Sequence, residues 1–209
     1  MNLATTHSIG EQSVTGGCLA ITVFEGTAAH AESRHAETRA LLQACGGTSL
    51  GEGPAKSWEH GRFDAPYLRD SLLSAGALCE TLETATSWSR IPALKAAVTE
   101  ALTAALTASG TAALVMCHIS HVYPTGASLY FTVVAGQRGD VAAQWDAAKA
   151  AACDAIVAHG GTITHHHAVG ADHRPWMTAE IGDLGVKVLR AVKQSLDPAG
   201  ILNPGKLIP

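Results

Sequence analysis

Residues 112–135 read AALVMCHISHVY, PTG and ASLYFTVVA, and this stretch decides the fold. Both apolar runs are rich in β-branched and aromatic residues, which predicts strands over 112–123 and 127–135. The intervening Pro124, Thr125 and Gly126 are typical of a tight turn, so the two strands should pair as an antiparallel hairpin. The centre of the fold is therefore expected to be an antiparallel sheet.

The second strand of this hairpin alternates between two faces. One face carries Ser128, Tyr130 and Thr132, and the other carries Leu129, Phe131 and Val133. This pattern is typical of a sheet whose apolar face packs on helices while its polar face lines a site. A tyrosine on such a face can be structural or catalytic, and the pattern alone leaves both open.

Helical patterns flank the hairpin. Residues 91–109 place Pro92 in the first turn and repeat large apolar residues at four-residue spacing before Gly110. Asp140 is a candidate N-cap for a helix over 140–158. Further helices are expected at 27–44, 178–195 and, as two short helices around a turn, within 54–69. Further strands are expected at 18–24, 48–51 and 162–164. Residues 74–86 could form a strand or a helix, and a strand is favoured. This order predicts an α+β fold, an antiparallel sheet with helices packed on one face, behind a polar lead-in over residues 1–17.

Composition narrows the class of protein. The chain has 209 residues, 47% of them hydrophobic, with a net charge of −4 and a pI near 6.2, which gives no general attraction to nucleic acid. We expect no apolar stretch of the roughly 18–20 residues that span a membrane. The five cysteines form no CxxC pair and are expected to be reduced and mostly buried, as in a cytoplasmic protein. The chain lacks both GxGxxG and GxxxxGK[ST], so it carries neither common nucleotide-binding motif.

The strongest local signal for chemistry is GGTITHHHAVG at 160–170, where three consecutive histidines leave a predicted strand for a glycine-bearing turn. Histidine titrates nearest neutrality and serves as a proton donor and acceptor, which favours an active-site loop. Solvated surface histidines and a metal site are the alternatives. Adjacent side chains of an extended segment point to opposite sides, which argues against all three binding one ion.

Two arginines are candidate anion-binding residues. Arg174 lies in ADHRPW (171–176), with Trp176, and the segment could be either a helix-entry packing motif or the lining of a pocket. Arg69 lies in PYLRD (66–70), where it could bind a phosphate or simply pair with Asp70 at the surface.

Eight segments together point to a known family: LAITVFEG (19–26), PYLRD (66–70), ETATSW (83–88), HVYPTGASLYF (121–131), QRG (137–139), GGTITHHHAVG (160–170), RPW (174–176) and LDPAGILNPGKL (196–207). From about residue 18 onward, the chain resembles the C-terminal part, or cap domain, of FAD-linked oxidases of the vanillyl-alcohol-oxidase type. The resemblance is closest to the alkyldihydroxyacetonephosphate synthase branch. It implies a ferredoxin-like cap domain truncated at its N-terminus, with FAD as the cofactor.

The resemblance also implies roles for individual residues. Tyr130 matches the tyrosine that acts as acid and base on the substrate carbon, and the histidine run (His165, His166, His167) matches residues that lie against the flavin and assist proton transfer. Arg69 and Arg174 are then expected to bind substrate, and Asn203, with His166 and His167, to contact the cofactor. The family exchanges the acyl group of an acyl-dihydroxyacetonephosphate for a long-chain alcohol through an adduct at the flavin N5, a step of ether lipid synthesis.

The family's N-terminal FAD-binding domain has no counterpart in these 209 residues, so we expect it to be a partner of this chain. The substrate is expected to be a small phosphorylated compound or a 2-hydroxy acid, because an FAD-dependent 2-hydroxy-acid oxidase or dehydrogenase is the alternative enzyme. A catalytically silent fragment or accessory module is a further alternative. A cap without its partner domain exposes apolar surface, which predicts self-association into a homo-oligomer.

Overall fold

The structure, a computed structural model, describes residues 7–9, 12–14 and 19–209, in two compact units, Met1–Leu68 and Arg69–Pro209. In the first unit, β1 (His7–Ile9) pairs antiparallel with β2 (Gln12–Val14). The helices α1 (Ala28–Ala44) and α2 (Gly53–Gly61) follow, and α3 (Ala65–Ser74) spans the boundary between the units. The helices predicted at 27–44 and within 54–69 are therefore confirmed.

Two predicted strands of the first unit are wrong. Leu19–Phe24 and Thr48–Gly51 have no regular secondary structure, while Cys18 lies outside the described residues. Their apolar, β-branched composition favours a strand only when a neighbouring strand supplies hydrogen bonds. None of the strands that the structure describes pairs with either segment.

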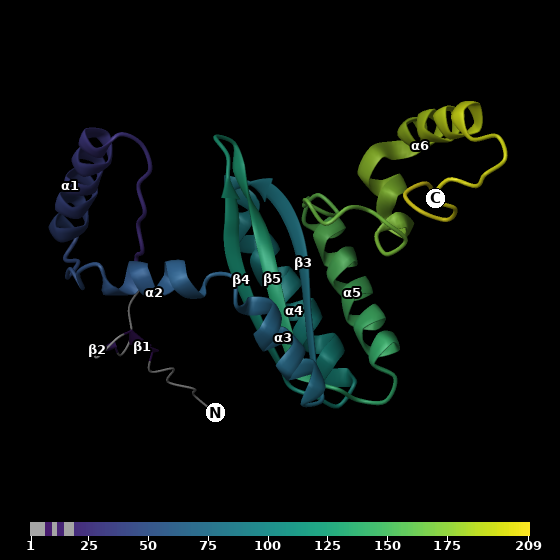
Figure 1. Cartoon of the computed structure of the whole chain (residues 1–209). Coiled ribbons are helices and arrows are strands. Elements are labelled where there is room, and N and C mark those ends of the chain that lie inside the picture. The colour runs from purple at the N-terminus through teal and green to yellow at the C-terminus, as the bar shows by residue number, and fades with distance from the viewer. Residues whose placement is uncertain (1–6, 10–11, 15–18) are drawn as a thin grey trace. The chain divides into compact units, whose positions relative to one another are not determined.

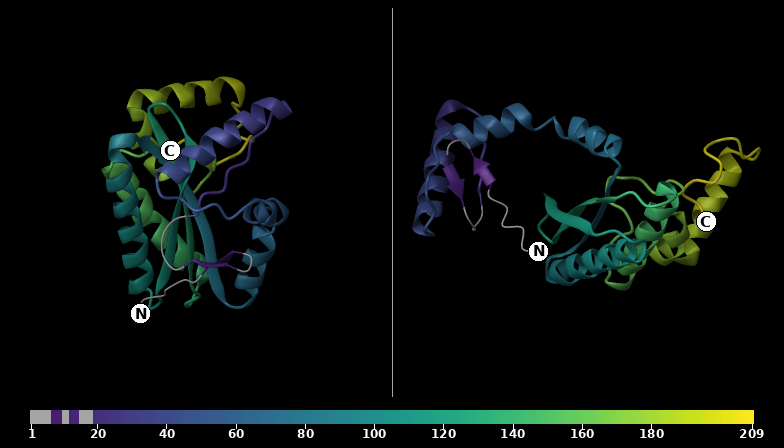
Figure 2. Two further views of the ribbon diagram at one scale, coloured as in Figure 1. Left: turned by 90° about the vertical axis from the view of Figure 1, so that its left-hand side faces the viewer. Right: turned by 90° about the horizontal axis from the view of Figure 1, so that it is seen from below.

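The second unit is built on a three-stranded antiparallel sheet in the order β3-β5-β4. Its strands are β3 (Ala77–Ser87), β4 (Ala113–Val122) and β5 (Gly126–Gly136). The helices α4 (Ile91–Ala108) and α5 (Val141–Ala158) pack on one face of this sheet (Figures 1 and 2). The predicted hairpin and the predicted α+β fold are both confirmed.

The hydrophobic core of this unit lies between the sheet and its two helices. Leu129, Phe131 and Val133 of β5 are fully buried, as their alternation predicts. They pack in one cluster with the buried stripe of α4 and with small residues of α5, listed as Leu94, Val98, Leu102 and Leu106 on α4 and Ala148, Ala152 and Ile156 on α5. Burying each of these large apolar side chains contributes about 1.5–3 kcal/mol to the stability of the folded chain. This packing leaves the opposite face of the sheet free to carry polar groups.

The expectation that no apolar stretch is long enough to span a membrane is wrong. The segment Trp88–Ala108, which is α4 with its preceding 3₁₀ turn, has 21 residues and a mean hydropathy of 1.2, so length and composition alone would allow it to cross a membrane. Its residues Ile91, Leu94, Val98, Leu102 and Leu106 form the buried stripe that packs on the sheet.

The cysteines of the described residues follow the expectation in part. Cys79 and Cys153 are buried and Cys117 is partly buried, whereas Cys45 is exposed, and none of these four forms a disulfide. Burial raises the pKa of the Cys153 thiol to about 11, which keeps it protonated and unreactive near neutral pH.

The last helix, α6 (Met177–Leu196), is interrupted rather than continuous. Gly182 has φ 72° and ψ 169°, a conformation that other residues rarely adopt, and the chain changes direction there. After α6, the Asp197 carboxylate accepts hydrogen bonds from the backbone N–H groups of Ile201 and Leu202, at 3.0 and 2.9 Å. Leu207 N–H then donates to the carbonyl of Gly170, at 2.8 Å. The C-terminal tail is thereby tied to the loop that carries the histidines.

Candidate active site

A buried carboxylate lies at the centre of the polar face of the sheet. Glu83 of β3 is paired with Tyr130 of β5 in the strand register, so both side chains lie on the face opposite the helices. The Glu83 side chain is only 3% exposed. Because burying an unpaired charge is costly, such a carboxylate needs partners close by.

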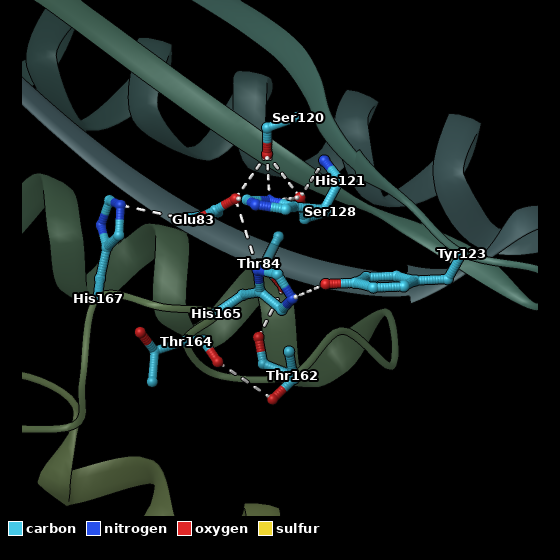
Figure 3. Close-up of polar contacts among 10 residues, drawn as sticks. All are labelled: Glu83, Thr84, Ser120, His121, Tyr123, Ser128, Thr162, Thr164, His165 and His167. Atoms are coloured by element: carbon cyan, nitrogen blue, oxygen red, sulfur yellow. Dashed lines mark hydrogen bonds and ion pairs between the residues drawn. The ribbon is translucent and has the colours of Figure 1, made fainter. Parts of the chain in front are cut away.

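A β-bulge in β4 supplies the first partners. Ile119 pairs with Leu129 and Val122 pairs with Ala127, so Ser120 and His121 together face the single residue Ser128. An extra residue on one strand redirects its side chains. In this case it brings both Ser120 and His121 to the polar face, beside Glu83 (Figure 3).

These groups form a directed chain of hydrogen bonds. His121 N–H donates to Ser128 Oγ at 3.0 Å, and Ser120 Oγ donates to Glu83 Oε1 at 2.6 Å. The two serine oxygens are 2.6 Å apart. Since the only hydroxyl proton of Ser120 goes to the carboxylate, Ser128 is the donor in the bond between the serines.

The segment before the histidines runs along the free edge of β3. Thr162 N–H donates to the Ala85 carbonyl at 3.0 Å, and His165 N–H donates to the Glu83 carbonyl at 3.1 Å. The strand predicted at 162–164 is nevertheless wrong. The Thr84 hydroxyl donates a hydrogen bond to the Thr162 carbonyl oxygen at 2.6 Å. This side-chain bond replaces a backbone hydrogen bond that a regular β-ladder would need.

The histidine run surrounds Glu83 from the other side (Figure 3). His165 Nδ1 lies 3.5 Å from Glu83 Oε1, and His167 Nε2 lies 3.5 Å from Glu83 Oε2. His121 Nδ1, from β4, is also 3.5 Å from Glu83 Oε1. Three imidazoles from two elements therefore converge on one carboxylate.

Tyr130 lies directly against this group. Its ring makes an edge-to-face contact with His167, with 5.3 Å between ring centroids. A second phenol, Tyr123, has its hydroxyl 3.1 Å from His165 Nε2. The structure thus brings together Tyr130, His165 and His167, as the resemblance implies.

The environment of Glu83 favours its ionised form. Burial by itself raises the pKa of this carboxyl. The hydroxyls of Ser120 and Ser128 outweigh that effect, together with the attraction of His165 and His167, so the pKa lies below its usual value. The group is consequently a buried negative charge at neutral pH.

His166 adopts an unusual backbone conformation, with φ 60°. Its ring lies 4.1 Å from that of His165 and 4.6 Å from that of His121, measured between centroids. One nitrogen from each of these three residues lies within 4.8 Å of the others, a set that could hold a metal ion. Tetrahedral zinc with Zn–N bonds of 2.0–2.1 Å needs ligand nitrogens about 3.4 Å apart, so the rings would have to move inward.

The other predicted site residues lie elsewhere. Arg69 is exposed and pairs with Asp70 at 2.8 Å, which is the surface arrangement. Arg174 lies beside the C-terminal tail, where a Cβ added at Gly205 would be 3.7 Å from its guanidinium. Asn203 is exposed in that tail, with φ 44°. The roles of Arg69, Arg174 and Asn203 stay predictions.

Four members of the site were not predicted: Glu83, Ser120, His121 and Tyr123. Glu83 begins the segment ETATSW (83–88), which contributed to the family resemblance, but no role was predicted for it. The bulge that orients Ser120 and His121 has no signature in the sequence. Trp176, by contrast, donates its indole N–H to Asp154 at 2.7 Å, which supports the packing alternative for this residue.

Comparison with known proteins places this geometry in a family. A family model described as FAD linked oxidases, C-terminal domain, matches residues 1–207. The chain belongs to this family. Members are FAD-linked, so FAD is the cofactor of the proteins that contain such a domain.

Two relatives that align with most of this chain share one name. The chain is 34% identical over 192 residues to alkyldihydroxyacetonephosphate synthase of Trypanosoma brucei brucei, and 34% identical over 204 residues to that of Dictyostelium discoideum. These alignments cover 91% and 97% of this chain but 31% and 33% of the relatives. The chain therefore spans about a third of their length.

A solved structure of an alkyldihydroxyacetonephosphate synthase is similar in fold. It superposes with a TM-score of 0.56 at 26% identity, over 83% of this chain and 29% of that one. The mixed arrangement of helices and a three-stranded antiparallel sheet is thus the fold of an FAD-linked oxidase C-terminal domain.

Proposed function

We propose that this chain is the substrate-facing domain of an enzyme that works as an alkyldihydroxyacetonephosphate synthase, in partnership with an FAD-binding domain. The reaction joins a long-chain alcohol to dihydroxyacetonephosphate through an ether bond and releases the acyl group as a fatty acid, without net oxidation or reduction. The relatives' shared name and the histidine–tyrosine geometry support this proposal.

One observation carries the proposal: Tyr130, His165 and His167 converge on the ionised Glu83 on a single face of the sheet. A general acid or base must lie within hydrogen-bonding reach of the proton that it moves. The Tyr130 ring contacts the His167 imidazole edge to face, with 5.3 Å between ring centroids, and these two groups are the proposed acid–base pair. The buried carboxylate supplies the negative charge that stabilises an imidazolium after proton uptake.

The polar face also fits a flavin ring. His166 and His167 are both exposed. Imidazole N–H groups donate hydrogen bonds, and a flavin edge offers nitrogen and carbonyl oxygen acceptors. His166 and His167 are the residues that would contact the ring. The flavin, when bound, supplies an electron sink for the substrate carbon.

The residues of this chain would then have separate roles in proton transfer and in substrate binding. Tyr130 removes a proton from the substrate carbon that bears the acyloxy group, and returns a proton to it when the ether is complete. His167 receives and holds the proton of Tyr130 during exchange. The triosephosphate moiety needs a cationic partner, and Arg69 or Arg174 takes this role when the FAD-binding domain is present.

The test pairs the chain with an FAD-binding domain and FAD, and follows the conversion of acyl-dihydroxyacetonephosphate and a long-chain alcohol into alkyl-dihydroxyacetonephosphate and free fatty acid. Tyr130→Phe and His166→Ala should each lower turnover by about 10²-fold or more, while the fold, followed by circular dichroism, is retained. D-lactate and glycolate are tested in parallel for reduction of the flavin. Turnover of either hydroxy acid without ether formation would replace this proposal with the 2-hydroxy-acid dehydrogenase alternative.

A further inference from the structure

The hydrogen-bond donors around Glu83 determine which nitrogen of each neighbouring histidine ring carries the proton. An ionised carboxylate only accepts hydrogen bonds, so any ring nitrogen that faces it closely is favoured as N–H over a lone pair. The serine protons are already committed, from Ser128 to Ser120 and from Ser120 to Glu83 Oε1. Neither hydroxyl can therefore donate to an imidazole.

His165 presents its Nδ1 to the carboxylate. This nitrogen is buried, has no hydrogen-bond partner and lies 3.5 Å from Glu83 Oε1. Its other nitrogen, Nε2, lies 3.1 Å from the hydroxyl of Tyr123. A neutral ring that carries its proton on Nδ1 turns a donor toward the carboxylate and leaves Nε2 to accept from the phenol.

His167 presents the opposite nitrogen. Its Nε2 lies 3.5 Å from Glu83 Oε2, so a neutral ring carries its proton there. The lone pair of this neutral ring then resides on Nδ1. This ring is the one in edge-to-face contact with Tyr130.

We propose that Glu83 is the positioning residue of the histidine run, and that it fixes opposite tautomers in two rings: Nδ1–H in His165 and Nε2–H in His167. His165 is thereby an acceptor toward Tyr123, and His167, whose ring contacts Tyr130, keeps Nδ1 as its basic nitrogen. The importance of this basic nitrogen for turnover rests on the proposed function. The assignment of tautomers rests only on the geometry around Glu83.

Ring ¹⁵N chemical shifts test the assignment directly. The chain is labelled with ¹⁵N in its histidine rings, and long-range ¹H–¹⁵N correlation spectra are recorded at a pH where the rings are neutral. Signals are assigned with the single variants His165→Gln and His167→Gln. We expect the Nδ1–H pattern for His165 and the Nε2–H pattern for His167. The reverse pattern in either ring, or the same tautomer in both, overturns the proposal.

Three substitutions then distinguish the effect of Glu83 on the tautomers from the effects of neighbouring residues. Glu83→Gln keeps the shape but turns one oxygen into an NH₂ donor, so at least one of the two rings should switch tautomer. Tyr123→Phe should leave His165 as Nδ1–H, and a switch there would make Tyr123 the determinant and refute the role of Glu83. Glu80→Gln, at an exposed position of the same strand, should leave both rings unchanged.

Activity is read separately with the FAD-binding domain present. Glu83→Gln should lower kcat by about 10²-fold or more with a smaller change in KM, since it disturbs a base rather than a binding contact. Glu83→Asp should restore part of kcat because it restores the charge. An unchanged kcat in Glu83→Gln would show that Glu83 has no role in turnover. The predicted tautomers together with no ether formation by the native protein would refute the proposed function but leave the tautomer assignment standing.

Discussion

Glu83 and Tyr130 stand directly opposite each other in the β3–β5 ladder, and this pairing places a buried carboxylate next to a phenol on the open face of the sheet. Paired residues on one face have Cβ atoms about 4.5–5.5 Å apart. The histidine run reaches the same point from the loop beyond α5. The site is thus fixed by strand register, which is one of the most rigid features of a sheet.

Removing the hydroxyl of Tyr130 should remove proton transfer but not the fold. In Tyr130→Phe the edge-to-face contact with His167 can persist, since it involves only the ring. We expect turnover, measured with the FAD-binding domain, to fall by about 10²–10⁴-fold, the usual contribution of general acid–base catalysis. Thr132→Val, on the same face two residues further along β5, is the control. Equal losses in both variants would mean that the face is sensitive to any change, which would contradict a specific role for the phenol.

Acid should weaken the contribution of Glu83 to stability. Its pKa in the folded chain lies below the ordinary 4.5, so its favourable interactions are complete above that pH and are lost as the pH falls through the folded value. The free energy of unfolding of the native chain, relative to Glu83→Gln, should therefore decrease on acidification below about 4.5. Urea unfolding at a series of pH values measures it, with Glu80→Gln as the control. A relative stability that rises toward low pH would show that burial dominates and that the pKa is raised.

The sheet and its two covering helices could be predicted because their signals are local. The turn at Pro124–Gly126 and the four-residue apolar spacing of α4 are both recognised from residues that are close in the sequence. The predicted N-cap is confirmed, because the Asp140 side chain accepts hydrogen bonds from two backbone N–H groups at the start of α5. The alternation of β5 likewise identified its buried face. These patterns depend on no knowledge of distant contacts.

The centre of the site was beyond such patterns because it depends on register. Glu83 becomes important only when β3 is aligned with β5, and His121 reaches it only through the bulge in β4. The reasoning that adjacent histidines must diverge assumed extended backbone, whereas His166 is left-handed. The strands predicted at 18–24 and 48–51 failed for a related reason, since a strand depends on a partner that the local sequence does not reveal.

The core under the sheet should be sensitive to truncation. Leu102 of α4 is fully buried among β5 and α5, so Leu102→Ala should destabilise the chain by about 2–5 kcal/mol through lost burial and the resulting cavity. Leu114, on the open face of β4, is 56% exposed, and Leu114→Ala should change stability by no more than about 0.5 kcal/mol. Urea denaturation followed by circular dichroism compares them. Similar losses would indicate that the open face is as well packed as the helical one.

The C-terminal tail should loosen when Asp197 is replaced. This carboxylate accepts from the N–H groups of Ile201 and Leu202 and also pairs with Lys193. In Asp197→Ala, hydrogen exchange at Ile201 and Leu202 should become faster, because their acceptor is gone. Asp183→Ala, at an exposed position of α6, should leave exchange in the tail unchanged. Unchanged protection in Asp197→Ala would show that other contacts hold the tail.

Zinc provides a test of what the imidazoles are for. A metal ion that binds Nε2 of His165 together with His121 and His166 displaces the Tyr123 phenol from that nitrogen and draws the ligand nitrogens together. We therefore expect the purified native chain to contain substoichiometric zinc, measured by mass spectrometry of the elements. Tyr123→Phe should bind added zinc more tightly in competition with a chromophoric chelator, and His121→Ala should bind it more weakly. One zinc per native chain that survives dialysis against a chelator would contradict the role of His165 as an acceptor toward Tyr123, because a nitrogen bound to a metal has no lone pair left to accept a hydrogen bond.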